Sequence, residues 1–248
     1  MQTGGSTGDN VPLYAPCRKL SFSDPFKWLK MGWQDFRRVP WHSLAYGLVF
    51  VFLGWALLYF AWANENTALI ISLLFGFLIM GPVLCFGLYD ISHQLEENRE
   101  PTFRHERKKA FHEMTHERLF AMIMSMLFVS LFILLSIMAG IEPVLGQKTG
   151  SYAVASILIA MFFAGVAFCA SVFTLPMILH QDADGATAIL TSINAVLRNK
   201  RALMLWAFLI FMLTAVGFAT ALIGLAFITP VLGYSTWHAY RETITMDG

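Results

Sequence analysis

Charged residues are scarce in this sequence of 248 residues. Asp, Glu, Lys and Arg make up 13% of the chain and hydrophobic residues 57%, whereas about a quarter of a typical globular domain is charged. The 17 basic and 16 acidic residues leave a formal net charge of +1. The chain therefore lacks the strong positive field that a nucleic-acid-binding surface needs, and we exclude nucleic acid as a partner.

Cysteine is also rare, and a signal peptide is not evident. The three cysteines are Cys17, Cys85 and Cys169. The last two lie in apolar runs, so no pair is available for an extracytoplasmic disulfide, and we expect all three to act as small apolar fillers. The first residues lack an apolar stretch of signal-peptide length. We expect residues 1–22 to be a disordered cytoplasmic N-terminus and residues 23–248 to form one membrane domain.

Long apolar runs, by contrast, recur along the chain. A hydrocarbon core of about 30 Å requires about 20 apolar residues per helix, and this predicts an all-α polytopic membrane protein with six transmembrane helices. The predicted spans are 43–63, 68–89, 119–140, 152–179, 201–217 and 220–239. The last two share one run, 202–236, which fits two crossings only with a very tight turn near Gly217 to Thr220. A re-entrant hairpin is the alternative for that run.

The placement of basic residues predicts the orientation of these spans. Lys and Arg accumulate on cytoplasmic loops, and 16 of the 17 basic residues fall on one side of the six-span layout, with Lys148 as the exception. Both termini are therefore predicted to be cytoplasmic. Trp41, Trp62 and Trp237 lie at span ends, where aromatic rings prefer the membrane interface.

The chain contains a weak internal repeat. Pro82, Pro176 and Pro230 stand near the ends of the second, fourth and sixth spans, where a proline favours a helix kink. Amphipathic segments at 24–39, 103–117 and 184–198 precede the three pairs of spans. We predict three pseudo-repeats, about 23–98, 101–181 and 184–241, each a cytoplasmic amphipathic helix followed by a transmembrane hairpin. The alternative is that amphipathic linkers merely join the hairpins.

One motif is typical of zinc metalloproteases. His112, Glu113 and His116 match the pattern of two histidines four residues apart with a glutamate between them; the imidazoles would bind zinc and the carboxylate would activate water. His105 lies on the same helical face as a further metal candidate. A third ligand would have to come from His93, Glu96, His180 or Asp182 on neighbouring loops. The alternatives are regulatory metal or proton binding and a solvated helix face, and no other cofactor is expected.

The interiors of the predicted spans contain no Asp, Glu, Lys or Arg, which disfavours an ion-coupled transporter. They also lack histidines that could ligate haem. Hydroxyl residues such as Thr174 and Thr214 are expected to serve helix packing. Small residues at four-residue spacing, Ala160 with Ala164 and Ala215 with Ala219, predict close helix packing within the chain or against a partner.

Several short motifs resemble a known family. They include Gly32-Trp33-Gln34-Asp35, Gly81-Pro82, Gly87-Leu88-Tyr89, Asp182-Ala183-Asp184 and Thr236-Trp237-His238-Ala239-Tyr240-Arg241. Together they resemble a bacterial family of predicted integral membrane proteins of unknown function. Its members are sometimes labelled as similar to cytochrome c oxidase subunit I. That label implies an association with respiratory complexes, but the histidines that would hold haem and copper are missing.

Three hypotheses for function follow. The first is a non-enzymatic accessory or assembly partner of a membrane complex in the bacterial inner membrane, with the lipid bilayer and either a membrane protein or a second copy of the chain as partners. The second is a channel or facilitator for a small or apolar solute, with its path between the spans that carry Pro82, Pro176 and Pro230. The third is a zinc metalloprotease that uses His112, Glu113 and His116.

Overall fold

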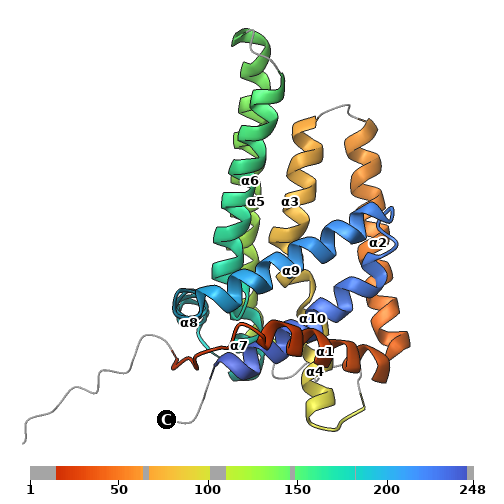
Figure 1. Ribbon diagram of the computed structural model, residues 1–248, viewed down its shortest axis with the longest axis vertical. Helices are drawn as coiled ribbons and strands as arrows, with labels where there is room; N and C mark the ends of the chain where they lie inside the picture. Colours follow the sequence, from red (N-terminus) through yellow and green to blue (C-terminus); the bar gives the residue numbers. More distant parts are fainter. Residues whose placement is uncertain (1–14, 64–66, 101–109, 146–148, 182, 245–248) are drawn as a thin grey trace, which may run out of the picture.

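The computed structural model describes residues 15–63, 67–100, 110–145, 149–181 and 183–244, which form ten helices and a single β-bridge (Figure 1). The helices are α1 (Asp24–Arg38), α2 (Pro40–Ala63), α3 (Thr67–Leu84), α4 (Phe86–Glu96), α5 (Ala110–Leu145), α6 (Thr149–Ser171), α7 (Thr174–Gln181), α8 (Gly185–Arg198), α9 (Lys200–Ala219) and α10 (Leu225–Thr243). In Figure 1, α2, α3, α5 and α6 run along the long axis, whereas α9 and α10 cross it obliquely.

Five stretches of the described chain are long and apolar enough to cross a membrane. They are Pro40–Phe60, Leu74–Glu96, Arg118–Met138, Val154–Gln181 and Lys200–Ala219. The all-helical, multi-pass architecture predicted from the sequence is confirmed at this level. The predicted sixth span, 220–239, is not among these stretches, so the six-helix layout is not confirmed.

The α9–α10 pair forms a hairpin whose tip lies against the side of α2. The backbone reverses at Ala221 and Leu222, which both have positive φ (52° and 70°). Trp55 of α2 donates a hydrogen bond from Nε1 to the carbonyl oxygen of Ala221, at 2.8 Å. Helix α2 continues from Trp55 to Ala63, about 12 Å further at 1.5 Å per residue. The hairpin thus turns back before the end of α2, as in the re-entrant alternative.

Helix α10 is buried in protein rather than exposed as a membrane-facing helix. Its side chains at Tyr234, Trp237 and Tyr240 are at most 1% exposed. Two glycines on neighbouring helices allow this close approach: a Cβ at Gly47 of α2 would collide with the carbonyl oxygen of Ala226, and a Cβ at Gly32 of α1 would collide with the Ser235 hydroxyl. Helix α10 also ends in polar residues and is not apolar enough along its length to count among the candidate spans.

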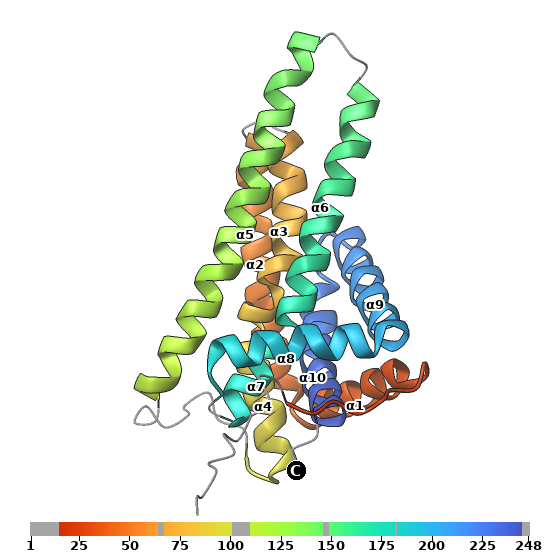
Figure 2. The same ribbon diagram turned by 90° about the vertical axis from the view of Figure 1, so that its left-hand side faces the viewer.

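Helices α1 and α8 lie across the lower ends of the long helices (Figure 2). The α1 face formed by Trp28, Gly32 and Phe36 is buried, while Phe26 and Trp33 are about half exposed. In α8, the Asp184 side chain caps the helix by accepting from the backbone N–H groups of Ala186 and Thr187, at 3.2 and 3.4 Å. Both segments are therefore helical, as predicted from their amphipathic patterns.

The amphipathic segment predicted at 103–117 does not form a separate helix in the part that is described. Residues 101–109 lie outside the described residues, and from Ala110 onward the backbone is part of α5, which continues without a break to Leu145. The described part of this segment is therefore the beginning of a long helix and not a separate surface helix. The predicted boundaries of the three pseudo-repeats stay a prediction.

The two ends of the described chain lie together. Cys17 and Ile244 form an antiparallel bridge, and the Arg18 backbone N–H donates to the carbonyl oxygen of Thr243 at 2.9 Å. Within the segment predicted to be disordered, the Leu20 N–H donates to Asn199 Oδ1 at 2.9 Å. Residues 17 and 18 and residues 243 and 244 are therefore on the same side of the molecule.

Candidate functional site

A largely apolar cavity of about 340 Å³ lies between α3, α4, α6, α9 and α10, with Phe50 of α2 also on its wall. Seven aromatic side chains line it: Phe50, Phe75, Phe77, Tyr89, Phe168, Phe208 and Phe211. Among its described lining residues there is no Asp, Glu, Lys, Arg or His. The volume is at the lower end of the range for ligand pockets, about 300–1,000 Å³.

Two glycines leave part of this space open. Gly81 of α3 and Gly165 of α6 both line the cavity, and a Cβ added at either would meet nothing within 4 Å. These glycines differ from Gly32 and Gly47, where helices touch. Gly165 is itself exposed, so a larger side chain there would extend into free space at the mouth of the cavity without displacing a neighbouring helix.

Helix breaks at the bottom of the cavity shape its wall. Helix α3 ends at Leu84 and α4 begins at Phe86, while α6 ends at Ser171 and α7 begins at Thr174. Pro82 lies within α3 shortly before the first break and lines the cavity. Pro176 follows the second break, and Pro230 lies inside α10. The breaks thus lie beside two of the three prolines, and the kink that we predicted at each proline stays a prediction.

The cavity opens toward the outer surface between α6 and α9. Met161 of α6 and Phe208 and Phe211 of α9 line it, yet they are 53%, 56% and 40% exposed. Side chains that both line a cavity and face outward form its rim. Since α6 and α9 both contribute to candidate membrane spans, this rim would face lipid in a membrane.

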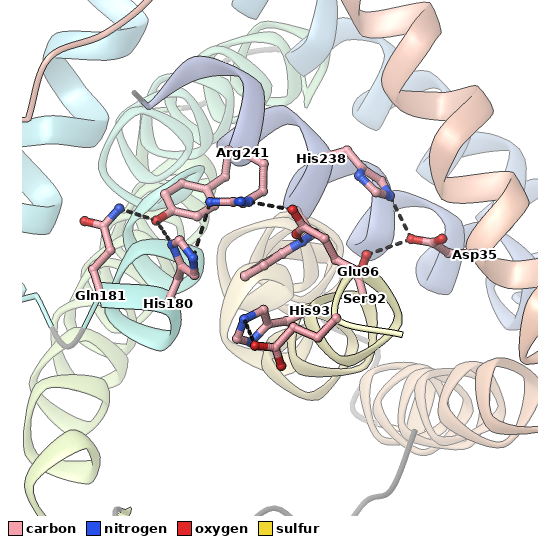
Figure 3. Close-up of polar contacts among 11 residues, drawn as sticks. Asp35, Ser92, His93, Glu96, His180, Gln181, His238 and Arg241 are labelled. Carbon is pink, nitrogen blue, oxygen red and sulfur yellow. Dashed lines mark hydrogen bonds and ion pairs between the residues drawn. The ribbon is translucent and has the colours of Figure 1, made fainter. Parts of the chain in front are cut away.

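A polar network lies just beyond the last cavity residue of α10, Thr236 (Figure 3). Glu96 of α4 accepts from Trp237 Nε1 at 3.0 Å and from Arg241 Nε at 2.9 Å. The Tyr240 hydroxyl contacts His180 Nδ1 at 3.0 Å and accepts from Gln181 Nε2 at 2.5 Å. We call these residues the basal network; it connects α4, α7 and α10 below the cavity.

The geometry indicates which nitrogen of His180 carries the proton. Arg241 Nη1 lies 3.3 Å from His180 Nε2, and a guanidinium can only donate hydrogen bonds. Nε2 therefore accepts, and the neutral ring carries its proton on Nδ1, facing the Tyr240 hydroxyl. Trp237 and Tyr240 are at most 1% exposed, so packed side chains close the cavity on this side.

A second polar cluster connects α1 to α4 and α10. Asp35 Oδ2 accepts from Ser92 Oγ and from His238 Nε2, both at 2.7 Å, and Asp35 is 5% exposed (Figure 3). Two donors on one buried carboxylate oxygen satisfy much of its need for hydrogen bonds. Asp35 therefore fixes α1 against the other two helices.

Glu242 forms a third contact between α1 and α10. Its carboxylate accepts from Lys27 Nζ at 2.7 Å and from Trp28 Nε1 at 2.8 Å, and Arg18 Nη1 lies 3.8 Å away. Burial alone would raise the pKa of Glu242, but the hydrogen bonds from Lys27 and Trp28 and the charges of Lys27 and Arg18 lower this pKa below its ordinary value. Glu242 is therefore held in its charged form.

The predicted zinc site lies outside the described residues and stays a prediction. The backbones of His112, Glu113 and His116 belong to α5, but the positions of their side chains are not described. His105 and Asp182 lie outside the described residues altogether. His93 and His180 do approach each other, with ring centroids 5.5 Å apart. Glu96, however, is bound to Trp237 and Arg241. Among the described residues, no group of three His, Cys, Asp or Glu could hold a metal.

Sequence reasoning suggested a path between the spans that carry Pro82, Pro176 and Pro230, but it predicted neither the lining of the cavity nor the basal network. His180 and His238 were recognisable as polar residues at span ends, and Tyr240 as an interfacial ring, but nothing in the sequence pairs His180 with Tyr240 or Asp35 with His238. The residue pairs are 60 and 203 positions apart. The concentration of polar residues in 234–243, at the end of an apolar run, was the available signal.

The chain was also compared with known proteins. Residues 69–180 match the family model described as "Predicted integral membrane protein (DUF2189)". The match covers slightly less than half of the chain, from the first turn of α3 to His180 of α7. It confirms the resemblance to a membrane family of unknown function, and its description carries neither an activity nor the cytochrome oxidase label. No curated protein and no solved structure matches the chain.

Residues 69–180, which we call the DUF2189 segment, form one side of the cavity. This segment includes Gly81, Pro82, Tyr89, Gly165 and Ser171, whereas the α9–α10 hairpin that forms the other side lies beyond residue 180. The protein is thus an integral membrane protein of unknown function, and the candidate site extends from the DUF2189 segment into the C-terminal hairpin.

Proposed function

We propose that this protein takes an apolar or weakly polar solute from the bilayer and holds it in the cavity between α3, α6 and the α9–α10 hairpin. This is the facilitator hypothesis in the form of a binding protein. The cavity itself supports it: about 340 Å³ of largely apolar space with a rim at Met161, Phe208 and Phe211. An apolar molecule gains little from leaving lipid for an apolar pocket, so the fit of shape and polar contacts must supply selectivity.

The basal network favours a protein that binds a solute over a channel through which the solute passes freely. Trp237 and Tyr240 are buried directly beyond the cavity and are hydrogen-bonded to Glu96, His180 and Gln181. These two side chains lie behind the cavity wall, and a solute could leave on that side only if they moved. The function proposed is therefore uptake, retention and release of a solute.

We also propose that the protein lies in the bacterial inner membrane with both termini in the cytoplasm. Sixteen of the 17 basic residues fall on one side of the predicted layout. A re-entrant hairpin returns to the side from which it started, so a sixth full crossing is not needed to keep the two ends on one side.

The accessory role is the second candidate. Ala215 and Ala219 of α9, predicted as a small-residue packing face, are exposed in the single chain, and a partner helix or a second copy could pack there. Purification in mild detergent, followed by identification of stoichiometric polypeptides, tests this role. The zinc-protease alternative depends on side chains outside the described residues and gains no support here.

Photolabelling in proteoliposomes tests the binding function. We expect a diazirine-bearing dodecane to label residues of the cavity wall, such as Met161 and Phe208, when adducts are mapped by mass spectrometry. Gly165→Phe should obstruct the mouth of the cavity and remove most of this labelling. The matched control is Val166→Phe, since Val166 is on the same helix, is 40% exposed and does not line the cavity. Equal cavity labelling of both variants would contradict the proposal.

A further inference from the structure

The cavity is not lined by hydrocarbon alone. Four hydroxyl-bearing residues line it and are buried: Tyr89, Ser171, Thr214 and Thr229, with exposed fractions of 3%, 2%, 5% and 7%. Within the described structure none of these four hydroxyls has a hydrogen-bond partner. The fifth hydroxyl on the wall, that of Thr236, donates to the carbonyl oxygen of Leu232 at 2.8 Å.

The missing partners are unusual for these residue types. A Ser or Thr inside an apolar helix commonly donates to the carbonyl four residues earlier, and Ser125, Thr174 and Ser235 do so here. Burying a hydroxyl without a hydrogen bond costs free energy. The hydroxyls on the cavity wall are therefore expected to find their partner in whatever occupies the cavity.

The four hydroxyls form two pairs by position in the fold. Thr214 stands five residues before the end of α9 and Thr229 is the fifth residue of α10, so both lie at a similar distance from the hairpin tip. Tyr89 and Ser171 lie close to the helix breaks that follow α3 and α6. Aromatic side chains, including Phe77 and Phe211, supply the apolar wall.

The absence of charged residues from the described cavity wall further restricts which molecules can bind there. A carboxylate, phosphate or ammonium group would enter a region whose described lining residues carry no opposite charge, and burying an unpaired charge is far more costly than burying a neutral oxygen. A pure hydrocarbon would leave the hydroxyls without partners. A neutral molecule with an apolar body and one oxygen group satisfies both conditions.

We propose that the cavity binds a neutral, single-chain lipid-like molecule, an alcohol, ketone or ester, whose oxygen is hydrogen-bonded by one of these hydroxyl pairs. This inference rests on the proposed binding function and names its ligand class. The volume of about 340 Å³ suits one short chain and is too small to enclose a two-chain phospholipid. The exposed rim lets such a molecule enter from the bilayer with its chain already in an apolar environment.

Competition among matched probes tests this ligand class. In phosphatidylcholine vesicles, 2-dodecanone, dodecane and dodecanoate each compete with a diazirine-bearing dodecanol for labelling of the cavity wall. At equal concentration in the bilayer, the ketone is expected to compete about five- to tenfold more strongly than the hydrocarbon, the advantage expected from about one neutral hydrogen bond. The carboxylate is expected to be the weakest competitor.

Isosteric variants identify the polar contact. Thr214→Val with Thr229→Val, or Tyr89→Phe with Ser171→Ala, should abolish the preference for the ketone while dodecane competition stays unchanged. Because these hydroxyls have no hydrogen-bond partner among the described residues, the variants should retain the thermal stability of the parent, which separates loss of recognition from misfolding. If neither pair of substitutions alters the preference, the proposed polar contact is wrong.

The outcomes also separate this inference from the function on which it rests. If Gly165→Phe blocks labelling but ketone and hydrocarbon compete equally in the parent protein, the solute-binding function stands and the ligand class is overturned. If Gly165→Phe leaves labelling unchanged, both proposals fail. Stronger competition by dodecanoate than by 2-dodecanone would also overturn the assignment of a neutral ligand.

Discussion

Individual polar residues hold the lower helices of this protein together, and Asp35 is the most buried carboxylate among them. Its Oδ2 accepts from both Ser92 and His238 at 2.7 Å. These partners come from α4 and α10, while Asp35 belongs to α1. A single side chain therefore joins three helices that are distant in sequence.

Replacing Asp35 tests this connection. Asp35→Ala removes the shared acceptor and leaves a buried hydroxyl and an imidazole without their partner, so we expect a loss of about 2–4 kcal/mol in the free energy of unfolding. Thermal and denaturant unfolding in detergent measure it. Ser92→Ala, which removes only one donor, should cost less than half as much. Equal stability of Asp35→Ala and the parent would show that the cluster does not contribute.

Glu242 gives a pH-dependent prediction with a definite sign. Its pKa in the folded protein lies below the ordinary value of 4.5, so its contribution to stability is fully present above that ordinary value and is lost as the pH falls through the lower, folded value. The parent should be more stable than Glu242→Gln at pH 6 to 8, by about 1 kcal/mol because the group is partly exposed. The difference should vanish in acid. A gap that widened as the pH fell would contradict this assignment.

At the scale of the helix, glycines have two opposite roles. Gly47 lies where α2 touches the backbone of Ala226, whereas Gly165 faces open space. The same substitution should therefore have opposite effects at the two positions, which gives a direct comparison.

Gly47→Ala is expected to destabilise the protein by about 1–3 kcal/mol, because the added methyl group collides with backbone of α10. Gly165→Ala should be neutral or stabilising by up to about 1 kcal/mol, since alanine favours a helix and meets no neighbour. Unfolding of the two variants under the same conditions measures the difference. A larger loss at Gly165 than at Gly47 would contradict the packing described here.

The α9–α10 hairpin gives a prediction about depth in the membrane. A nitroxide on Cys placed at Ala221, the hairpin tip, should be deep in the bilayer, whereas one at Ala63, the end of α2, should be near a headgroup region. Depth-dependent relaxation by a lipid-soluble and a water-soluble quencher, in a cysteine-free background, distinguishes the two. Equal access to the water-soluble quencher at both sites would mean that the hairpin crosses completely.

Hydropathy predicted most of the helical architecture, because span length is set by bilayer thickness. The amphipathic segment 184–198 was also predicted correctly as a helix, and its cap by Asp184 depends only on local sequence. The sixth span was not confirmed because α10, which covers most of it, ends in polar residues and is not apolar enough to count as a membrane span. Its Tyr234, Trp237 and Tyr240 are buried by neighbouring helices instead. Sequence features that act locally, such as a helix cap, therefore predicted the structure better than features whose effect depends on a neighbouring helix.

At the scale of the whole molecule, the site is a product of tertiary packing. The cavity needs the DUF2189 segment on one side and the hairpin on the other, and its key residues are separated by more than 100 positions, as Tyr89 is from Thr214. Neither pattern nor spacing could have predicted that these hydroxyls line one space. The prolines at 82 and 176 indicated irregular helices but not the space beside them.

The central claim, that the cavity holds a solute, is tested most directly by mass spectrometry of the protein purified from its own membranes. Native spectra of the parent and of Val166→Phe should show one small neutral molecule bound per chain, identified after extraction by its mass. Gly165→Phe, folded to the same extent, should lack it. If Gly165→Phe carried the same molecule at the same occupancy, the cavity would not be its binding site and the proposed function would be wrong.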